Sequence, residues 1–316
     1  MASKIKVGIS QCLLGENVRY DGGHKLDRFL RDTLGQFVEW VPVCPEVECG
    51  LSIPREAMRL VGDIDNPRLL TQKTGIDHTE RMMRWAEKRV KELADEDLCG
   101  FIFKIGSPSS GMRDIKVYNE KGYASKKGIG MFARVFMETF PLMPVEDDGR
   151  LHDPDLREKF IERLFVFRRW QDLCKNNKTI NGLVEFHTEH KLLIMAHSPK
   201  TVSALGQLAA HAKDKPQEAI FSEYMAMLLT GLNLHASIKK NTNVLHHVLG
   251  YFKKELSADE KQEALAVIEE YHRGYVPLIV PIVLMQHYVR KFDQRYLQRQ
   301  HYLHPHPIEL MLRNHV

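Results

Sequence analysis

The sequence predicts an α/β domain with a layered, mainly parallel sheet, followed by an all-α domain. In the first half, short apolar runs typical of strands alternate with amphipathic helical segments, the rhythm of layered α/β domains. After residue 148 strand signals nearly vanish and helical periodicity takes over. We therefore expect two domains, over residues 1–148 and 149–316, divided in a polar stretch with Gly149 and an Asp153-Pro154 helix start.

The first half carries three apolar, strand-like runs and two helical segments. The longer helical segment has apolar residues at helical spacing and an Asp77-x-x-Glu80 capping box. The predicted strands are residues 5–10, 37–43 and 100–105, and the predicted helices are residues 27–34 and 75–94.

Four segments of the second half carry helical periodicity. The last opens on a Ser257-x-x-Glu260 capping box and closes on Gly274, which is a common residue just past a helix end. The predicted helices lie within residues 155–175, 182–197, 218–232 and 257–274.

Composition describes a globular chain, with 43% hydrophobic and 27% charged residues. No apolar stretch is long enough to cross a membrane, and the amino-terminal residues lack the apolar core of a signal peptide, so we expect a cytoplasmic protein. The net charge of +4 is too small to require a nucleic-acid partner. Five cysteines in such a chain make structural disulfides improbable and direct attention to metal binding or thiol chemistry.

Three loops carry the polar and thiol side chains of interest, and each follows a predicted strand. Cys12 follows the first strand, Cys44 the second, and the Ser107–Ser110 loop the third. Because ligands of open parallel sheets bind outside the carboxyl ends of the strands, these loops are expected to converge on one site.

Cys12, Cys44 and Cys49 are the candidate metal ligands, since thiolates hold iron–sulfur clusters and structural zinc. Their spacing, C-x31-C-x4-C, matches no compact ferredoxin or zinc-finger motif, and free cysteines are often simply buried. Glu46 is placed to act as a general acid or base, or merely to cap a turn. Ser107 and Ser109 offer hydroxyl or backbone N–H donors, unless their loop is an ordinary turn.

The second half offers two other candidates. His187, His190 and His197 share one helix face, where they could bind a metal or, with Lys191, a phosphate. The favoured explanation is that these histidines belong to a packed or solvated helix face. A basic segment that lacks interleaved aromatic residues could contact nucleic acid. Its basic side chains are Lys239, Lys240, His246 and His247.

Long motifs in the first half resemble the thiouracil desulfurase family, which was known as a domain of unknown function before its activity. The motifs are "SQCLLGENVRYDGG", "VCPEVECGLSIPRE" and "GFIFKIGSPSSGM". The second half resembles the YbgA-type domain that is often fused behind it, through "EFHTEHKLLIMAHSPK", "KKNTNVLHHVLGYFKKELS", "GYVPLIVPIVLMQHYVRK" and "QHYLHPHPIELMLRNH". Together the two resemblances cover nearly the whole chain.

The first resemblance implies a non-redox desulfuration. In that family three cysteines hold a [4Fe–4S] cluster, the open iron takes the sulfur of a thiolated pyrimidine, and water replaces that sulfur at the ring carbon. Cys12 and Cys44 match two ligand positions, Glu46 matches the family glutamate, and Ser107 or Ser109 matches the loop serine. Arg19 and Tyr20, in the loop after Cys12, are candidate substrate contacts.

Ser110 departs from the family pattern, which usually has a cysteine there as the third ligand. A serine hydroxyl is a far poorer iron ligand than a thiolate. One hypothesis is that Cys49 supplies the missing ligand, which makes the chain an iron–sulfur desulfurase of thiolated nucleobases. The other is a cluster-free binding protein with a degenerate pocket, whose helical domain engages nucleic acid or a protein partner.

Overall fold

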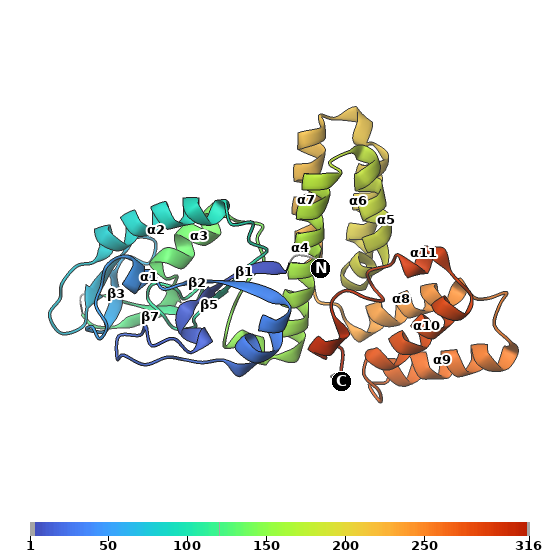
Figure 1. The fold of residues 1–316 in the computed structure, drawn as a ribbon, viewed down its shortest axis with the longest axis horizontal. Coiled ribbons are helices and arrows are strands. Elements are labelled where there is room, and N and C mark those ends of the chain that lie inside the picture. The colour runs from blue at the N-terminus through green and yellow to red at the C-terminus, as the bar shows by residue number, and fades with distance from the viewer. Residues whose placement is uncertain (1–3, 120, 315–316) are drawn as a thin grey trace. The chain divides into compact units, whose positions relative to one another are not determined.

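The computed structural model describes residues 4–119 and 121–314. Its residues divide into two units, Met1–Phe160 and Ile161–Val316, and the division falls within helix α4 (Pro154–Asn176). Figure 1 shows strands and helices in the first unit and helices in the second. The predicted α/β domain followed by an all-α domain is thereby confirmed. No helix among the described residues is both long and apolar enough to cross a bilayer.

The first unit contains a fully parallel four-stranded sheet, in the order β2-β1-β5-β8. Its central strands are short and buried, as expected for a parallel sheet covered on its faces. The strands are β1 (Ile5–Ser10), β2 (Val38–Val43), β5 (Phe101–Phe103) and β8 (Val145–Asp147). The three strands predicted from the sequence are all present in this sheet.

A second, mixed sheet was not predicted. Its order is β4-β3-β6-β7, with antiparallel pairs β3–β4 and β6–β7 and a parallel pair β3–β6. The strands are β3 (Met58–Gly62), β4 (Pro67–Thr71), β6 (Ile115–Tyr118) and β7 (Ala124–Gly128).

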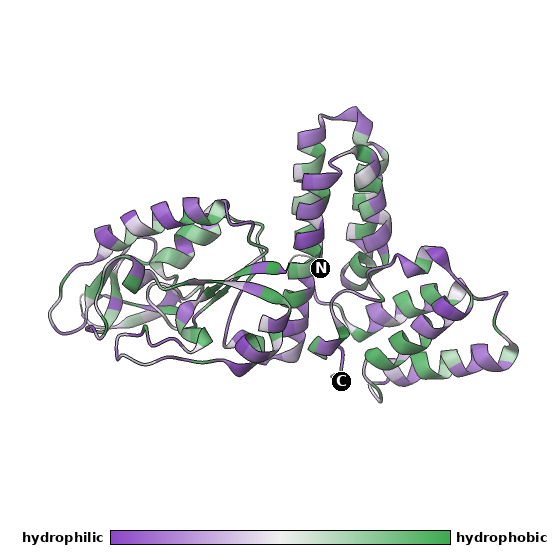
Figure 2. Ribbon diagram, in the orientation of Figure 1, coloured by the Kyte–Doolittle hydropathy of each residue, from purple (hydrophilic) through white to green (hydrophobic). Residues whose placement is uncertain are grey.

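Two helices pack against the parallel sheet, α2 (Thr79–Ala94) and α3 (Met131–Thr139). In Figure 2 hydrophobic and hydrophilic residues alternate along α2, which fits a helix with one buried face. The rings of Phe101 and Phe103 on β5 pack on those of Phe132 and Phe136 on α3, with centroids 4.8 to 6.2 Å apart. This aromatic cluster fixes α3 over the strand that leads into the serine loop.

Two local predictions differ from the structure. The predicted helix over residues 27–34 is instead a π-helical turn, Phe29–Thr33, followed by a 3-10 turn, Leu34–Gln36. Helix α2 has His78 at its N-cap, and Asp77 accepts a hydrogen bond from the backbone N–H of Thr79, so the expected capping box is absent there. The box predicted at Ser257 and Glu260 is present.

The second unit is built from helices around one large hydrophobic core. The described part of this unit contains no strand. After α4 the helices are α5 (Ile180–His197), α6 (Pro199–Ala210), α7 (Gln217–Leu232), α8 (Ile238–Gly250), α9 (Ala258–His272), α10 (Ile279–Lys291) and α11 (Arg295–Gln298).

Candidate active site

A cavity of about 410 Å³ lies where the loops after β1, β2 and β5 meet, at the carboxyl ends of the parallel strands. Its volume falls within the range typical of small-molecule sites. The side chains that line it include two thiols, a carboxylate from helix α1 (Pro45–Glu48), three serines and several cations. Those used below are Cys12, Arg19, Tyr20, Cys44, Glu46, Arg55, Lys104, Ser107 and Ser110. The predicted convergence of the three loops is therefore observed.

Both thiols that line the cavity are buried. Cys12 sits in the 3-10 turn Gln11–Leu14, and Cys44 is the N-cap of the short helix α1 (Pro45–Glu48). Burial raises the pKa of the Cys12 thiol, although the positive charges of Arg19 and Lys104 oppose this. Burial, and after it the Glu46 carboxylate, raises the pKa of Cys44 to about 12. Without a cationic ligand, the Cys44 thiol is therefore protonated at neutral pH.

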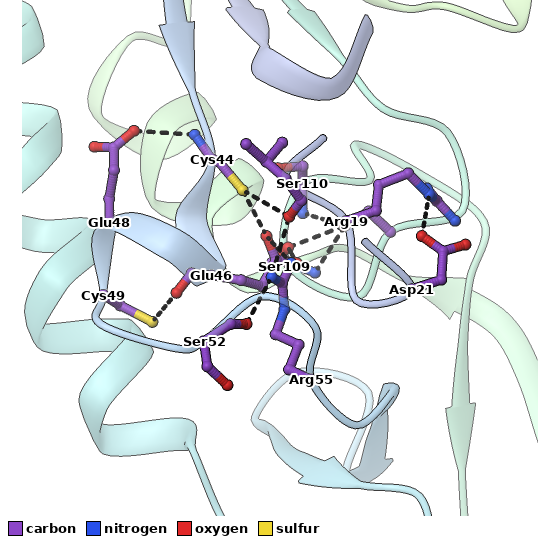
Figure 3. Close-up of polar contacts among 12 residues, drawn as sticks. Arg19, Asp21, Cys44, Glu46, Glu48, Cys49, Ser52, Arg55, Ser109 and Ser110 are labelled. Carbon is purple, nitrogen blue, oxygen red and sulfur yellow. Dashed lines mark hydrogen bonds and ion pairs between the residues drawn. The ribbon is translucent and has the colours of Figure 1, made fainter. Parts of the chain in front are cut away.

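Glu46 lies at the centre of the polar contacts around the cavity (Figure 3). Its Oε1 accepts a hydrogen bond of 2.5 Å from Ser109 Oγ, and its Oε2 lies 3.6 Å from the Cys44 sulfur. Arg55 Nη2 lies 3.7 Å from the same Oε2. The carboxylate is mostly buried, so these contacts fix the direction of both of its oxygens.

The serine loop holds its hydroxyl groups in a short chain. Ser107 Oγ and Ser109 Oγ share a hydrogen bond of 2.9 Å, and Ser107 Oγ also accepts from the backbone N–H groups of Ser109 and Ser110. Ser107 and Ser110 line the cavity, whereas Ser109 is fully buried beside it. Ser109 therefore connects Ser107, at the wall, to the Glu46 carboxylate.

Helix α3 anchors this loop through backbone hydrogen bonds. Gly130 N–H donates to the carbonyl of Gly111 at 2.7 Å, and Ala133 N–H donates to the carbonyl of Ser109 at 3.2 Å. A Cβ atom at Gly130 would lie 2.6 Å from the carbonyl carbon and oxygen of Ser109. Only glycine permits this close approach of the helix to the loop.

Arg19 and Tyr20, the predicted substrate contacts, both line the cavity. Arg19 Nε lies 3.6 Å from an Asp21 carboxylate oxygen, and the Arg19 guanidinium lies 5.4 Å from the centre of the Tyr20 ring. Tyr20 is 43% exposed, so part of its ring is available to a bound molecule.

Cys49 lies outside the set of residues that line the cavity. Its sulfur faces the backbone oxygen of Glu46 at 3.2 Å, whereas the Cys44 sulfur faces the Glu46 carboxylate (Figure 3). Cys49 closes the single turn of α1 and packs against the hydrophobic cluster around Leu60 and Met82. The helical turn that follows Cys44 turns the Cys49 side chain away from the cavity.

Arg55 and Lys104 are among the cavity residues that were not predicted from the sequence. Lys104 directly follows β5 and pairs with Asp148 at 2.9 Å. Its place at the end of a strand was a usable signal, by the same argument that identified Cys12 and Cys44. Arg55 lies in the loop between α1 and β3, and no spacing rule connects it to Glu46.

The histidines predicted on one helix face of the second unit have separate partners. His187 Nδ1 contacts Tyr224 Oη at 2.9 Å, His190 Nδ1 contacts the Phe186 carbonyl at 2.8 Å, and His197 Nε2 contacts Glu162 at 2.6 Å. They do not converge on one point. Over residues 4–119 and 121–314, no group of three or more His, Cys, Asp or Glu side chains is arranged to hold a metal ion.

The basic segment of the second unit lies on α8. Lys240 Nζ donates to the carbonyls of His197 and His235, both at 2.7 Å, so its charge is used within the helical unit. Lys239, His246 and His247 are exposed. A nucleic-acid contact through this segment stays a prediction.

Comparison with known proteins divides the chain in the same way. Residues 7–148 match the family model of the 2-thiouracil desulfurases, and residues 191–307 match a protein family of unknown function, DUF1722. The uncharacterized protein YbgA of Escherichia coli (strain K12) is 29% identical over 153 residues, which are 48% of this chain and 90% of YbgA. The uncharacterized protein YbbK of Bacillus subtilis (strain 168) is 30% identical over 108 residues, 33% of this chain and 71% of YbbK.

One solved structure is also similar, that of a "[4Fe-4S]-dependent thiouracil desulfidase TudS". It is 30% identical in sequence, and the match covers 48% of this chain and 95% of that one, with a TM-score of 0.40. With the motifs around Cys12, Cys44 and Ser107 gathered at one cavity, the chain belongs to the 2-thiouracil desulfurase family through its first unit and carries a DUF1722 domain behind it.

Proposed function

We propose that the cavity removes sulfur from a thiolated pyrimidine such as thiouracil and replaces it with oxygen from water. Membership of the 2-thiouracil desulfurase family supports the reaction class. The observation that carries the proposal is the buried Glu46 carboxylate, held by Ser109 at a cavity that also contains two thiols. Such a carboxylate is suited to proton transfer beside a bound ring.

The proposed exchange is neither an oxidation nor a reduction. A water oxygen forms a bond to the ring carbon, the carbon–sulfur bond breaks, and the sulfur leaves with the two protons of the water as hydrogen sulfide. The ring carbon ends as a carbonyl. No electron acceptor or donor is required, and the protein has only to bind the ring, position water and move protons.

Glu46 takes the proton of the attacking water at Oε2, which faces the cavity thiol, while Ser109 holds Oε1. Because Ser109 donates to Glu46, Ser107 donates its hydroxyl proton to Ser109, and a proton accepted by Ser107 from water at the wall can pass through Ser109 to Glu46. Arg19 and Tyr20 contact the ring, since both line the cavity and Tyr20 presents a partly exposed aromatic face.

A [4Fe–4S] cluster, which is named for the solved desulfidase, would draw on Cys12 and Cys44 here. Thiolates are the usual ligands of such clusters. Ser110, at the third ligand position of the family, lines the cavity with a hydroxyl in place of a thiolate, and Cys49 faces away from the cavity. The residues at the cavity therefore do not fit a site of three thiolates, and no step above passes through a cluster.

Iron analysis tests the Cys49 hypothesis directly. Iron and acid-labile sulfide are measured after anaerobic purification and reconstitution for the wild type, Cys49→Ala and Ser110→Cys. About four iron atoms per chain in the wild type, lost in Cys49→Ala, would mean that Cys49 is a ligand and that the end of α1 rearranges when the cluster binds. Iron bound only by Ser110→Cys would mean that the chain lacks a third ligand.

Activity is tested by anaerobic incubation with 2-thiouracil, following sulfide release and the formation of uracil. We expect Glu46→Gln to lower turnover by roughly 100-fold or more, because proton transfer by a positioned side chain contributes about that much. Glu39→Gln is the control, at an exposed carboxylate on β2 outside the cavity. No sulfide release by any preparation, with or without iron, would favour the cluster-free binding protein instead.

A further inference from the structure

We propose that Arg55 is a positioning residue that holds Glu46 and the Val18–Tyr20 loop in their working arrangement. The inference rests on the proposed function, because it assigns Arg55 a role through Glu46. It is carried by a set of contacts that join three loops, described next.

Arg55 makes backbone and side-chain contacts on three sides. Its Nη1 donates to the carbonyl of Val18 at 3.0 Å and to that of Ser52 at 3.3 Å. Its backbone N–H donates to the carbonyl of Tyr20 at 2.8 Å. Its Nη2 lies 3.7 Å from Glu46 Oε2. One residue thus connects the loop after β1 and the loop before β3 to the helix that bears the carboxylate.

Burial strengthens the attraction between the Arg55 guanidinium and the Glu46 carboxylate. The side chain is 9% exposed and that of Glu46 is 13% exposed, so water screens their attraction only in part. Because Ser109 already holds Oε1, the attraction to Arg55 acts on Oε2, the oxygen that faces the Cys44 sulfur. Arg55 and Ser109 together leave the carboxylate one orientation.

The contacts of Arg55 also connect the loop that carries Arg19 and Tyr20 to the Glu46 carboxylate. Arg19 lies between Val18, whose carbonyl accepts from the Arg55 guanidinium, and Tyr20, whose carbonyl accepts from the Arg55 backbone N–H. If the guanidinium is lost, the bond to Tyr20 stays, but the loop that carries Arg19 is no longer connected through a side chain to the Glu46 carboxylate. Lysine has no planar fork, so a single nitrogen would have to replace contacts that Nη1 and Nη2 make from two positions.

The test combines hydrogen exchange with kinetics for Arg55→Gln, Arg55→Lys and the control Arg59→Gln. Arg59 lies four positions further on, on β3, where its guanidinium stacks on Tyr118 at 5.2 Å, and it does not line the cavity. Exchange of backbone amides is followed by mass spectrometry in peptides that cover residues 16–22 and 44–51. Kinetics follow sulfide release from 2-thiouracil.

We expect faster exchange in both peptides for Arg55→Gln, a smaller increase for Arg55→Lys and none for Arg59→Gln. In the kinetics we expect kcat of Arg55→Gln to fall roughly 10- to 100-fold and KM to rise by a smaller factor, because the loop that carries Arg19 and Tyr20 also loosens, with Arg55→Lys in between. If hydrogen exchange in both peptides of Arg55→Gln equals that of the wild type, the proposal that Arg55 connects the loops is overturned, whether or not the protein is active.

The remaining outcomes separate the two proposals. Faster exchange with unchanged kcat overturns the role of Arg55 in positioning Glu46, and a rise in KM alone would make Arg55 a substrate contact instead. Faster exchange in a protein whose wild type releases no sulfide overturns the proposed function, while the structural connection through Arg55 stands. If Arg55→Gln does not fold, Arg55→Lys supplies the same measurements.

Discussion

Replacing Gly130 with alanine tests whether the serine loop must keep its place for turnover. The added Cβ would lie 2.6 Å from the carbonyl carbon and oxygen of Ser109 and 2.8 Å from the backbone nitrogen of Gly111. Nonbonded carbon atoms prefer separations of about 3.5 Å, so the loop and α3 must separate by roughly 0.9 Å. All the atoms involved belong to backbone, so no side-chain rotation relieves the contact.

Two effects of this displacement can be measured. The overpacking should cost about 1–3 kcal/mol in the free energy of unfolding, measured by urea denaturation. Because the Ser109 hydroxyl would move away from Glu46 by a similar distance, sulfide release from 2-thiouracil should fall by roughly 100-fold, the typical effect of a misplacement of about 1 Å. The hydrogen bond that would be stretched is now 2.5 Å long.

Gly250→Ala is the matched control. Gly250 ends α8 in the helical unit, and an added Cβ there would meet no atom within 4 Å. This variant should keep full activity and gain up to about 1 kcal/mol of stability, because alanine restricts the unfolded chain more than glycine does. A folded Gly130→Ala protein with turnover within about twofold of the wild type would refute the reasoning, since the serine loop would then tolerate displacement.

Three further predictions concern stability. Glu162 is buried, 2.6 Å from His197 and 3.6 Å from Arg313, so Glu162→Gln should cost about 3 kcal/mol or more in urea unfolding of the helical unit, because it removes the negative charge that lies against two buried cationic side chains. Burial works to raise the pKa of Glu162, but the charge and hydrogen bond of His197, together with the charges of Arg313 and His306, outweigh burial and lower that pKa. The stability that this pair contributes is therefore present above the ordinary glutamate pKa of about 4.3, and it is lost as pH falls through the lower pKa of the folded protein. The difference in the free energy of unfolding between wild type and Glu162→Gln should therefore narrow between pH 7 and pH 3. Phe136→Ala should lower the free energy of unfolding of the first unit by about 3–5 kcal/mol, because it removes a ring from the centre of the aromatic cluster between α3 and β5. A loss below about 1 kcal/mol, measured by calorimetry, would contradict that packing.

The parallel sheet and the convergence of its loops could be predicted because both depend on local sequence. Buried parallel strands are short continuous apolar runs, and the residue after each run falls at the same edge of the sheet. This was sufficient to bring Cys12, Cys44 and Ser107 together. The mixed sheet was missed although β3, β4 and β6 carry apolar residues, because these strands are short, β7 ("ASKKG") is mostly polar, and the parallel pair β3–β6 joins segments far apart in the sequence.

The directions in which the side chains of the site point could not be predicted from the sequence, although the strands and their loops could. Cys44 and Cys49 are close in sequence, but one helical turn between them sends their sulfur atoms to different surroundings. Ser109 and Glu46 are 63 positions apart, and only the packing of α3 on the serine loop brings them into contact. The partners of Glu46 are set by tertiary packing, and the spacing of residues along the sequence does not predict them.

The bond between Gly130 and Gly111 has a consequence for how this family can vary. Residues 112–129 contain β6, which pairs with β3 inside the mixed sheet, and β7, which forms the edge of that sheet. The two ends of this segment are fastened together beside the serine loop, where Gly130 N–H meets the Gly111 carbonyl. We therefore expect substitutions on the edge strand β7 to leave the serine loop and the start of α3 in register.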